Sequence, residues 1–446
     1  MSLLAAARAE AGPTLRLAAP IIIGQVSQML MGVTDSVMIG RTGTVPLAAS
    51  AFGGNVFSIF YVLGIGLMIP VAILVARARG AERPEEAGEY LRHGLALAVL
   101  CGVAETLVMA LVGTQLHRFG QPSEVMAVVM PFYLLIASSI TPVLVYLVLR
   151  QFAEAMGRPW VPMFIMLAGV GLNALLNWIF IYGHLGMPAL GLTGAALSTL
   201  ISRSIGAGVI FSWLRLDPGM RPAWPRRWLG GWSRQRFGDL LRLGLPAGAM
   251  LTFESSAFVV SCVMIGWLGA VPLAAHQIAI CCASLAFMFP LGLGMAAGMR
   301  VSHAVGANER ARLRPIAFGA FGLGGMITLG FGVGFALGGP LIASWFVVDP
   351  AVIALAAQLL IVAAVFQLVD GTQVIGASVL RAVADVRVPM AITLAAYWGI
   401  ALPVGYLLGV RGPLGAVGVW TGIASGLAVA ALLLPWRFAR LTGRAN

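Results

Sequence analysis

The sequence has few charged residues and no lysine. Only 10% of its 446 residues are charged, whereas a typical soluble domain carries about 25%. All 28 basic residues are arginine, and 60% of the chain is hydrophobic. A water-soluble fold cannot bury so much apolar surface, so this composition excludes an ordinary soluble domain.

Cysteine is scarce, and the spacings typical of metal sites are missing. The four cysteines lie in apolar segments rather than in loops where an oxidising compartment would bridge them: Cys101, Cys262, Cys281 and Cys282. There is no CxxC pair and no Cys/His cluster, so nothing favours a structural metal. We also find no nucleophile motif and no phosphate-binding loop. We therefore predict a protein without a cofactor that is not an enzyme.

Long apolar runs fill the chain instead. Most are long enough to cross a hydrocarbon core of about 30 Å as a helix of about 20 residues. They predict an all-α membrane protein with twelve transmembrane helices, at residues 15–38, 47–75, 94–115, 127–149, 160–182, 191–214, 243–266, 272–298, 316–340, 351–379, 388–409 and 414–436.

The arginines predict the orientation of these helices. Most charge lies in three connections, Arg77 to Arg92, Arg215 to Arg242, and Arg300 to Arg314. With the N-terminus inside, roughly 24 of the 28 arginines face the cytoplasm, as the positive-inside rule requires. We expect a bacterial inner-membrane protein with both termini in the cytoplasm. In such a protein the formal charge of +12 reflects topology and not a nucleic-acid partner.

The two halves of the chain are copies of each other. Three short motifs recur with one constant offset: LRLAAP as LRLGLP, VMIG as VMIG, and PLAA as PLAA, beginning at Leu15, Val37 and Pro46 in the first half and at Leu241, Val263 and Pro272 in the second. An even number of helices per half predicts a parallel repeat about an axis along the membrane normal.

This repeat divides the chain into two lobes. We expect an N-lobe at residues 1–214, a cytoplasmic linker at 215–242 and a C-lobe at 243–446. Two such bundles can enclose a cleft, and rocking one against the other would expose it alternately to each side of the membrane.

Acidic residues inside the spans are costly, at least about 2.5 kcal/mol each on the most lenient scale. Four are present, Asp35, Glu105, Glu254 and Asp370. Glu254 and Asp370 lie about 12 and 10 residues from the cytoplasmic ends of their helices, so their depths are similar. We expect them to meet in the C-lobe, where two carboxylates share a proton or bind a cation such as Na⁺. Alternatively, each carboxylate is separately hydrogen-bonded to a neighbouring helix.

A second polar group is expected in the N-lobe. Asp35 and Asn177 lie at comparable heights, and Asn173 shares a helix face with Asn177. A carboxylate with carboxamide oxygens suits a hard cation or a carried proton. Alternatively, the asparagines only join helices by hydrogen bonds.

Two prolines occupy equivalent positions of the repeat. Pro20 and Pro246 lie inside the first and seventh predicted helices. A proline within a helix removes a backbone hydrogen bond and favours a bend. The bend either moves during transport or is a static kink.

The run PIIIGQVSQMLMGVTDSVMIGRTGTVPLAA, which begins at Pro20, resembles the opening of the multidrug and toxic compound extrusion (MATE) family. The resemblance continues through LPAGAMLTFESSAFVVSCVMIGWLG, FQLVDGTQVIGASVLRAVAD and GLNALLNWIFIYG, and covers essentially the whole chain. Having both Glu254 and Asp370 resembles the NorM-type branch. The family often adds a tyrosine near these acids, for which Tyr397 is the candidate here.

The resemblance implies a two-lobed exporter that exchanges external Na⁺ or H⁺ for cationic, amphipathic drugs, with Asp35 linked to proton or substrate handling. Membrane lipids are the expected surroundings, and we expect a monomer. The alternative is a flippase for a lipid or lipid-linked precursor. It is disfavoured because such a flippase needs a cationic cavity, whereas the embedded charges are expected to be mainly acidic. An intramembrane hydrolase using Glu254 and Asp370 is disfavoured because no nucleophile accompanies them.

Overall fold

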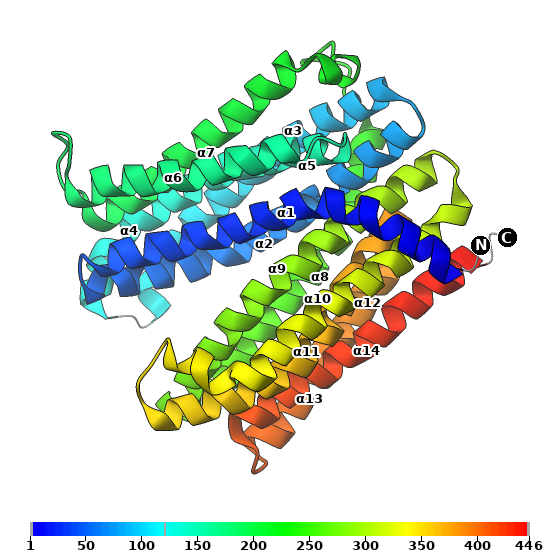
Figure 1. Cartoon of the computed structure of the whole chain (residues 1–446). Helices are drawn as coiled ribbons and strands as arrows, with labels where there is room; N and C mark the ends of the chain where they lie inside the picture. The colour runs from blue at the N-terminus through cyan, green and yellow to red at the C-terminus, as the bar shows by residue number, and fades with distance from the viewer. Residues whose placement is uncertain (1–2, 120–121, 444–446) are drawn as a thin grey trace. The chain divides into compact units, whose positions relative to one another are not determined.

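The computed structural model describes residues 3–119 and 122–443, and all regular structure in these ranges is helical (Figure 1). The first part of the chain contains α1 (Leu3–Gly40), α2 (Thr44–Gly80), α3 (Pro84–Gly113), η1 (Leu116–Phe119), α4 (Ser123–Ser138), α5 (Ile140–Ala155), α6 (Trp160–Tyr182), α7 (Gly191–Leu216) and η2 (Pro218–Ala223). The second contains α8 (Arg234–Gly266), α9 (Ala270–Gly306), α10 (Arg310–Ser344), α11 (Pro350–Ala382), α12 (Arg387–Leu394), η3 (Ala395–Ala401), α13 (Leu402–Gly405), η4 (Tyr406–Val410) and α14 (Gly415–Gly443).

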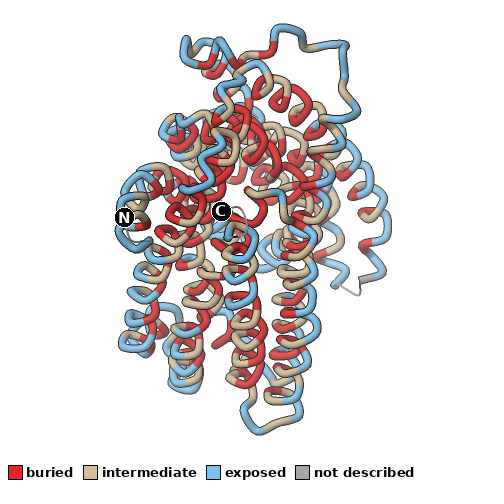
Figure 2. Tube along the Cα trace, turned by 90° about the vertical axis from the view of Figure 1, so that its right-hand side faces the viewer, coloured by how far each residue is buried: buried red, intermediate tan, exposed pale blue. Residues whose placement is uncertain are grey.

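Within the described residues, twelve helical spans are long and apolar enough to cross a membrane, which confirms the predicted number. Two of them are composite: α4 and α5 together form the span Ser123–Ala155, and α12 to η4 form Arg387–Val410. Large apolar side chains such as Leu111 and Leu337 are 69% and 82% exposed, as expected of surfaces that face lipid. Exposed residues follow the outer sides of the helices in Figure 2, while buried ones face neighbouring helices.

Several helices are longer than the apolar runs that predict them. α1 begins at Leu3 and α8 at Arg234, many residues before the predicted starts at 15 and 243. Hydropathy detects only the part of a helix that lies in hydrocarbon, whereas alanine, arginine and glutamate continue the helix into the polar region. The predicted span 388–409 also contains two π-helical segments, η3 and η4.

The chain packs as two compact units, Ile23–Gly248 and Met1–Ile22 with Ala249–Asn446. The unit borders follow Pro20 and Pro246 by the same short interval, so the division respects the repeat. The first half of α1 therefore belongs with the later helices and the first half of α8 with the earlier ones. The predicted lobes, residues 1–214 and 243–446, are separated at the connecting loop instead of inside α1 and α8. That division stays a prediction.

In the unit that contains Ala249–Asn446, helices α9, α10, α11 and α14 pack closely around one core. Trp420 and Tyr397 are its largest fully buried side chains. Small residues let the backbones approach: a Cβ on Gly422 would lie 2.2 Å from the backbone nitrogen of Gly405. Such close approach is typical of helix packing in membranes, where van der Waals attraction between helices, rather than the hydrophobic effect, drives their association.

Ion pairs hold the two leading half-helices to their units. Glu10 on α1 accepts hydrogen bonds from Arg300 and, at 2.8 Å, from Arg312. Arg236, at the repeat-equivalent position of α8, donates to Glu89 at 2.8 Å. The half-helix before Pro20 contributes the acid of its ion pair, whereas the half-helix before Pro246 contributes the arginine. In both cases the ion pair joins the half-helix to the unit with which it packs.

Candidate functional site

In the unit Ile23–Gly248, the structure brings Asp35, Asn173 and Asn177 together. The side-chain amide of Asn177 donates to Asp35 Oδ1 at 2.6 Å and to Asn173 Oδ1 at 3.3 Å. Both asparagines are fully buried, and Thr199 and Arg203 of α7 lie near the same carboxylate. Among the described residues, Asn177 Oδ1 and Asn173 Nδ2 have no hydrogen-bond partner. A free oxygen beside a carboxylate leaves a ligand position for a small cation.

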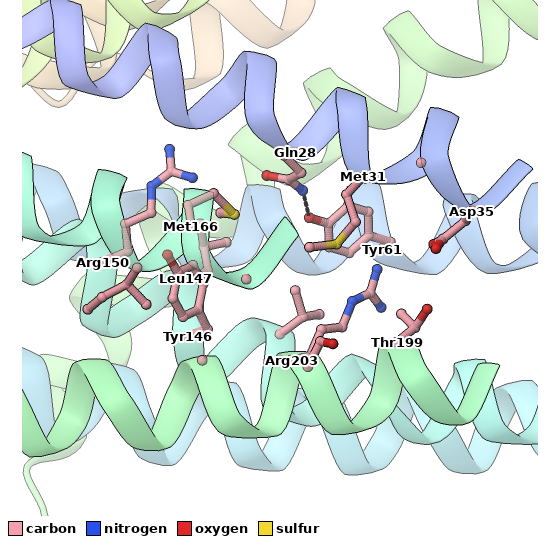
Figure 3. A pocket seen from close by; sticks show the side chains of 16 residues that line it. Gln28, Met31, Asp35, Tyr61, Tyr146, Leu147, Arg150, Met166, Thr199 and Arg203 are labelled. Carbon is pink, nitrogen blue, oxygen red and sulfur yellow. Dashed lines mark hydrogen bonds between the residues drawn. The ribbon is translucent and has the colours of Figure 1, made fainter. Parts of the chain in front are cut away.

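Asp35 also lines a cavity of about 260 Å³ (Figure 3). Its walls carry two arginines, two tyrosines and two methionines: Arg150, Arg203, Tyr61, Tyr146, Met31 and Met166. Methionine and aromatic side chains supply adaptable apolar surface, and half of the sixteen lining residues carry polar groups. This combination suits an amphipathic organic molecule.

The two arginines of the cavity differ in how their charge is compensated. Arg150 is buried and donates to Glu154 at 2.8 Å and to Gln25 at 2.6 Å. Arg203 donates to Ser139 Oγ at 2.6 Å, and its guanidinium carbon lies 5.2 Å from the centre of the Phe57 ring. Arg203 therefore has hydroxyl and aromatic contacts, with the Asp35 carboxylate nearby.

Buried charge in the described residues has both signs, while the expectation that charge inside the membrane is mainly acidic stays a prediction. Within residues 3–119 and 122–443, the buried acids are matched by as many buried arginines: Glu105, Glu154 and Asp370 against Arg92, Arg150 and Arg381. Arg150 and Arg381 lie near helix ends, and their long side chains reach into the bundle, whereas Arg92 donates to backbone oxygens of Arg227 and Gly230 in the connection before α8.

In the other unit, Glu254 of α8 and Asp370 of α11 lie close enough for their charges to interact. Asp370 is only 3% exposed, and Tyr397 is 1% exposed. The Tyr397 ring comes from the π-helical segment η3 and lies within electrostatic range of both carboxylates. Single-turn π segments are frequent at functional sites because they redirect side chains. The structure thus brings the predicted acids and the candidate tyrosine together.

Aromatic side chains enclose this acidic group. Phe258 packs against Tyr397 at 6.1 Å and against Phe366 at 6.2 Å between ring centroids. The indole of Trp398 donates to the backbone oxygen of Phe253, next to Glu254, at 3.3 Å. A wall of this kind keeps the local dielectric low, so a cation bound here interacts strongly with the carboxylates.

Several buried oxygens have no hydrogen-bond partner by distance and angle in the part of the chain that the structure describes. They include Asp370 Oδ1, Gln373 Oε1 and Tyr397 Oη. Oxygen ligands are those that hard cations prefer, and a carboxylate pair also holds a proton. The described residues contain no group of three or more His, Cys, Asp and Glu side chains. A monovalent ion or a proton therefore fits better than a transition metal.

Sequence reasoning missed Gln373 and Arg381. Gln373 lies one turn from Asp370 on α11, and Arg381 lies near the end of the same helix, where its charge interacts with Glu254. The repeat gives no signal for Arg381, because its constant offset pairs Arg381 with Ala155.

Two other embedded residues take no part in these groups. His276 Nδ1 accepts a hydrogen bond of 3.1 Å from the Trp420 indole, which fits a packing role. Glu105 is buried, and neither of its carboxylate oxygens has a partner among the described residues. We have no physical account of Glu105.

A family model, MatE, matches residues 20–179 and 246–407, which include all six acidic, amide and tyrosine candidates. The chain belongs to the MatE family. It is 36% identical to a probable multidrug resistance protein NorM of Mesorhizobium japonicum over 442 residues, covering 97% of this chain and 94% of that protein. It is 35% identical to a multidrug resistance protein NorM of Burkholderia vietnamiensis over 439 residues, covering 95% and 93%.

Solved structures of MatE-family proteins share the fold. An outward-facing multidrug resistance MATE transporter of the MOP superfamily superposes with a TM-score of 0.90 at 23% identity, over 100% of this chain and 98% of that one. The MatE-family assignment and the twelve apolar spans together make this chain a multi-pass membrane transporter of the NorM type.

Proposed function

We propose that this transporter is a secondary active multidrug antiporter, which exchanges external Na⁺ or H⁺ for cationic, amphipathic drugs. The observation that carries the proposal is the buried group of Glu254, Asp370 and Tyr397, in which the charges of the two carboxylates interact and Asp370 Oδ1 has no hydrogen-bond partner among the described residues. Two carboxylates in an apolar enclosure are costly unless a cation or a proton joins them. The energy of that binding is available to drive a conformational change.

Cation entry and drug export are coupled because the two ligands shift one conformational equilibrium in opposite directions. The cation favours one state of the transporter and the drug favours the other. A ligand that bound both states equally would shift nothing. The unit borders beside Pro20 and Pro246 support bending at these prolines as part of the change.

The cavity beside Asp35 supports an organic cation as substrate. Asp35 supplies a negative charge, and Met31, Met166 and Tyr146 supply apolar walls. The names of the curated relatives support drugs as the substrate class. We further propose a bacterial inner-membrane location with both termini in the cytoplasm, because that orientation satisfies the positive-inside rule.

A flippase for a lipid or lipid-linked precursor is the second candidate. Arg150 and Arg203 favour it, since two arginines line the cavity. However, Glu154 neutralises Arg150, and Asp35 lies near Arg203. The cavity therefore offers little net positive charge to a pyrophosphate, and antiport is the better proposal.

Reconstituted vesicles test the proposal. A fluorescent organic cation is loaded into proteoliposomes, and a Na⁺ gradient or a pH gradient is imposed separately. Antiport predicts that one of the gradients accelerates efflux and that the other does not. An efflux rate that is the same with and without each gradient would contradict the proposal. Transfer of a labelled anionic lipid across the membrane without a gradient would favour the flippase.

A further inference from the structure

The connection between α7 and α8, residues 217–233, is rich in tryptophan and arginine, and we call it the α7–α8 loop. It contains three tryptophans, three arginines and a single acid: Trp224, Trp228, Trp232, Arg221, Arg226, Arg227 and Asp217. The acid caps the loop's first turn, because Asp217 Oδ1 accepts a hydrogen bond of 2.8 Å from the backbone nitrogen of Gly219. Tryptophan together with arginine is typical of chain segments at the interface between membrane and water.

A buried arginine fixes the shape of the loop. Arg92 of α3 is only 3% exposed, and it donates to the backbone oxygens of Gly230 at 2.6 Å and Gly231 at 2.9 Å. Both glycines have positive φ angles, 84° and 61°, which glycine adopts without strain. The loop also packs tightly on α3, since a Cβ on Gly88 would lie 2.3 Å from the backbone oxygen of Ala223. The loop is therefore held in one conformation.

This conformation exposes apolar side chains next to arginines. Leu229 is 88% exposed and Trp232 is 45% exposed. Arg226 and Arg227, two and three residues from Leu229, are exposed as well. The Arg226 guanidinium lies 3.2 Å from the carboxylate of Glu85, but both side chains are largely exposed and such a pair contributes little. An anionic group can therefore compete for these arginines.

Aromatic contacts place the loop beside a membrane span. The rings of Trp224 and Trp228 lie 5.3 and 5.7 Å from the ring of Phe211, between centroids. Phe211 lies about 8 Å before the end of the span Gly191–Leu216, by the rise of a helix. It is on the opposite face of α7 from Ser202, which lines the Asp35 cavity. The two indoles are thus held at the outer end of a span, where tryptophan is enriched.

We propose that the α7–α8 loop is a membrane-interface anchor that binds the headgroups of anionic phospholipids. Arg221, Arg226 and Arg227 supply the positive charge, and Leu229 inserts among the headgroups beside the indoles. The whole loop belongs to the unit Ile23–Gly248, and the inference holds whichever ion or drug is transported. Because the loop leads directly into α8, bound lipid holds the start of that helix.

Backbone hydrogen exchange, followed by mass spectrometry, tests the proposal on the purified full-length protein. Phosphatidylglycerol, phosphatidylcholine or inorganic phosphate is titrated into the protein in a neutral detergent, and exchange is measured for peptides within residues 217–233. We expect phosphatidylglycerol to slow this exchange and phosphatidylcholine at the same concentration to leave it unchanged. Added salt is expected to weaken the effect, because it screens exposed charge.

Substitutions in the loop separate the charge from the apolar contact. Each arginine near an anionic surface contributes about fivefold in affinity, so removing all three is expected to raise the half-saturating phosphatidylglycerol concentration about tenfold or more. The variant is Arg221→Gln with Arg226→Gln and Arg227→Gln. These side chains are exposed, so the melting temperature should stay as in the wild type. Leu229→Gln keeps the charge and is expected to raise the same concentration several-fold, because it removes apolar surface from the anchor.

A matched control tests whether the effect belongs to the loop. Arg8→Gln with Arg16→Gln and Arg310→Gln removes three exposed arginines elsewhere and changes the net charge equally, so the loop should respond as in the wild type. Absence of slowing in the wild type, or equal slowing in the triple loop variant, would overturn the inference. Equal slowing by phosphatidylcholine or by inorganic phosphate would also overturn it, because the ligand would then be any lipid or a free anion.

Discussion

The carboxylate of Asp35 accepts a hydrogen bond of 2.6 Å from the side-chain amide of Asn177, a neutral group. The hydrogen bond leaves the formal charge of Asp35 in place at the wall of the cavity. That charge faces the cavity with the positive charge of Arg203 nearby, and we expect it to attract an incoming cation.

Replacing Asp35 by asparagine tests the role of this charge. We expect Asp35→Asn to weaken binding of a fluorescent organic cation about tenfold or more, because an interaction with a charged group contributes about 1.5–3 kcal/mol. Fluorescence anisotropy on purified protein measures the affinity. Ser36→Ala, which alters an exposed neighbour, is the control. Unchanged affinity in Asp35→Asn would remove Asp35 from the drug site.

The prolines at the unit borders are predicted to be moving bends. Pro20→Ala and Pro246→Ala restore a backbone donor and straighten the helix, so we expect turnover to fall several-fold while drug affinity stays within twofold. Pro13→Ala, in the same helix but away from the border, is expected to turn over normally. Wild-type turnover in both border variants would make these prolines static kinks.

The buried pair of Arg150 and Glu154 is predicted to be a stability element. Glu154→Gln leaves the guanidinium without its counter-charge and costs about 3–5 kcal/mol. The melting temperature in detergent should therefore drop clearly, whereas Arg150→Met with Glu154→Leu should recover most of it. Arg83→Gln, which breaks an exposed pair at 3.6 Å, should leave the melting temperature unchanged. A Glu154→Gln variant as stable as the wild type would contradict this assignment.

The number of spans and the meeting of Glu254 with Asp370 could be predicted from the sequence. Hydropathy integrates over about 20 residues, so errors at single positions cancel. The fixed rise of a helix converts residue counts into depth, which placed both acids at one level. Those two regularities need no knowledge of packing.

The charged partners could not be predicted in the same way. Arg150 and Arg381 lie near helix ends, where sequence alone does not say whether a long side chain points to water or into the bundle. The π-helical segment that carries Tyr397 packs in one core with Trp420 and Phe366, which are distant in sequence from each other.

The measurement that tests the central claim most directly is gradient-driven efflux of an organic cation by Glu254→Gln and Asp370→Asn, singly and together, in proteoliposomes. Each substitution keeps the shape of the side chain and removes its charge. The account predicts that the gradient that accelerates efflux in the wild type has no effect in either variant, while drug affinity at the Asp35 cavity and efflux by Glu309→Gln stay normal. Gradient-driven efflux at the wild-type rate in the double variant would contradict coupling through Glu254 and Asp370.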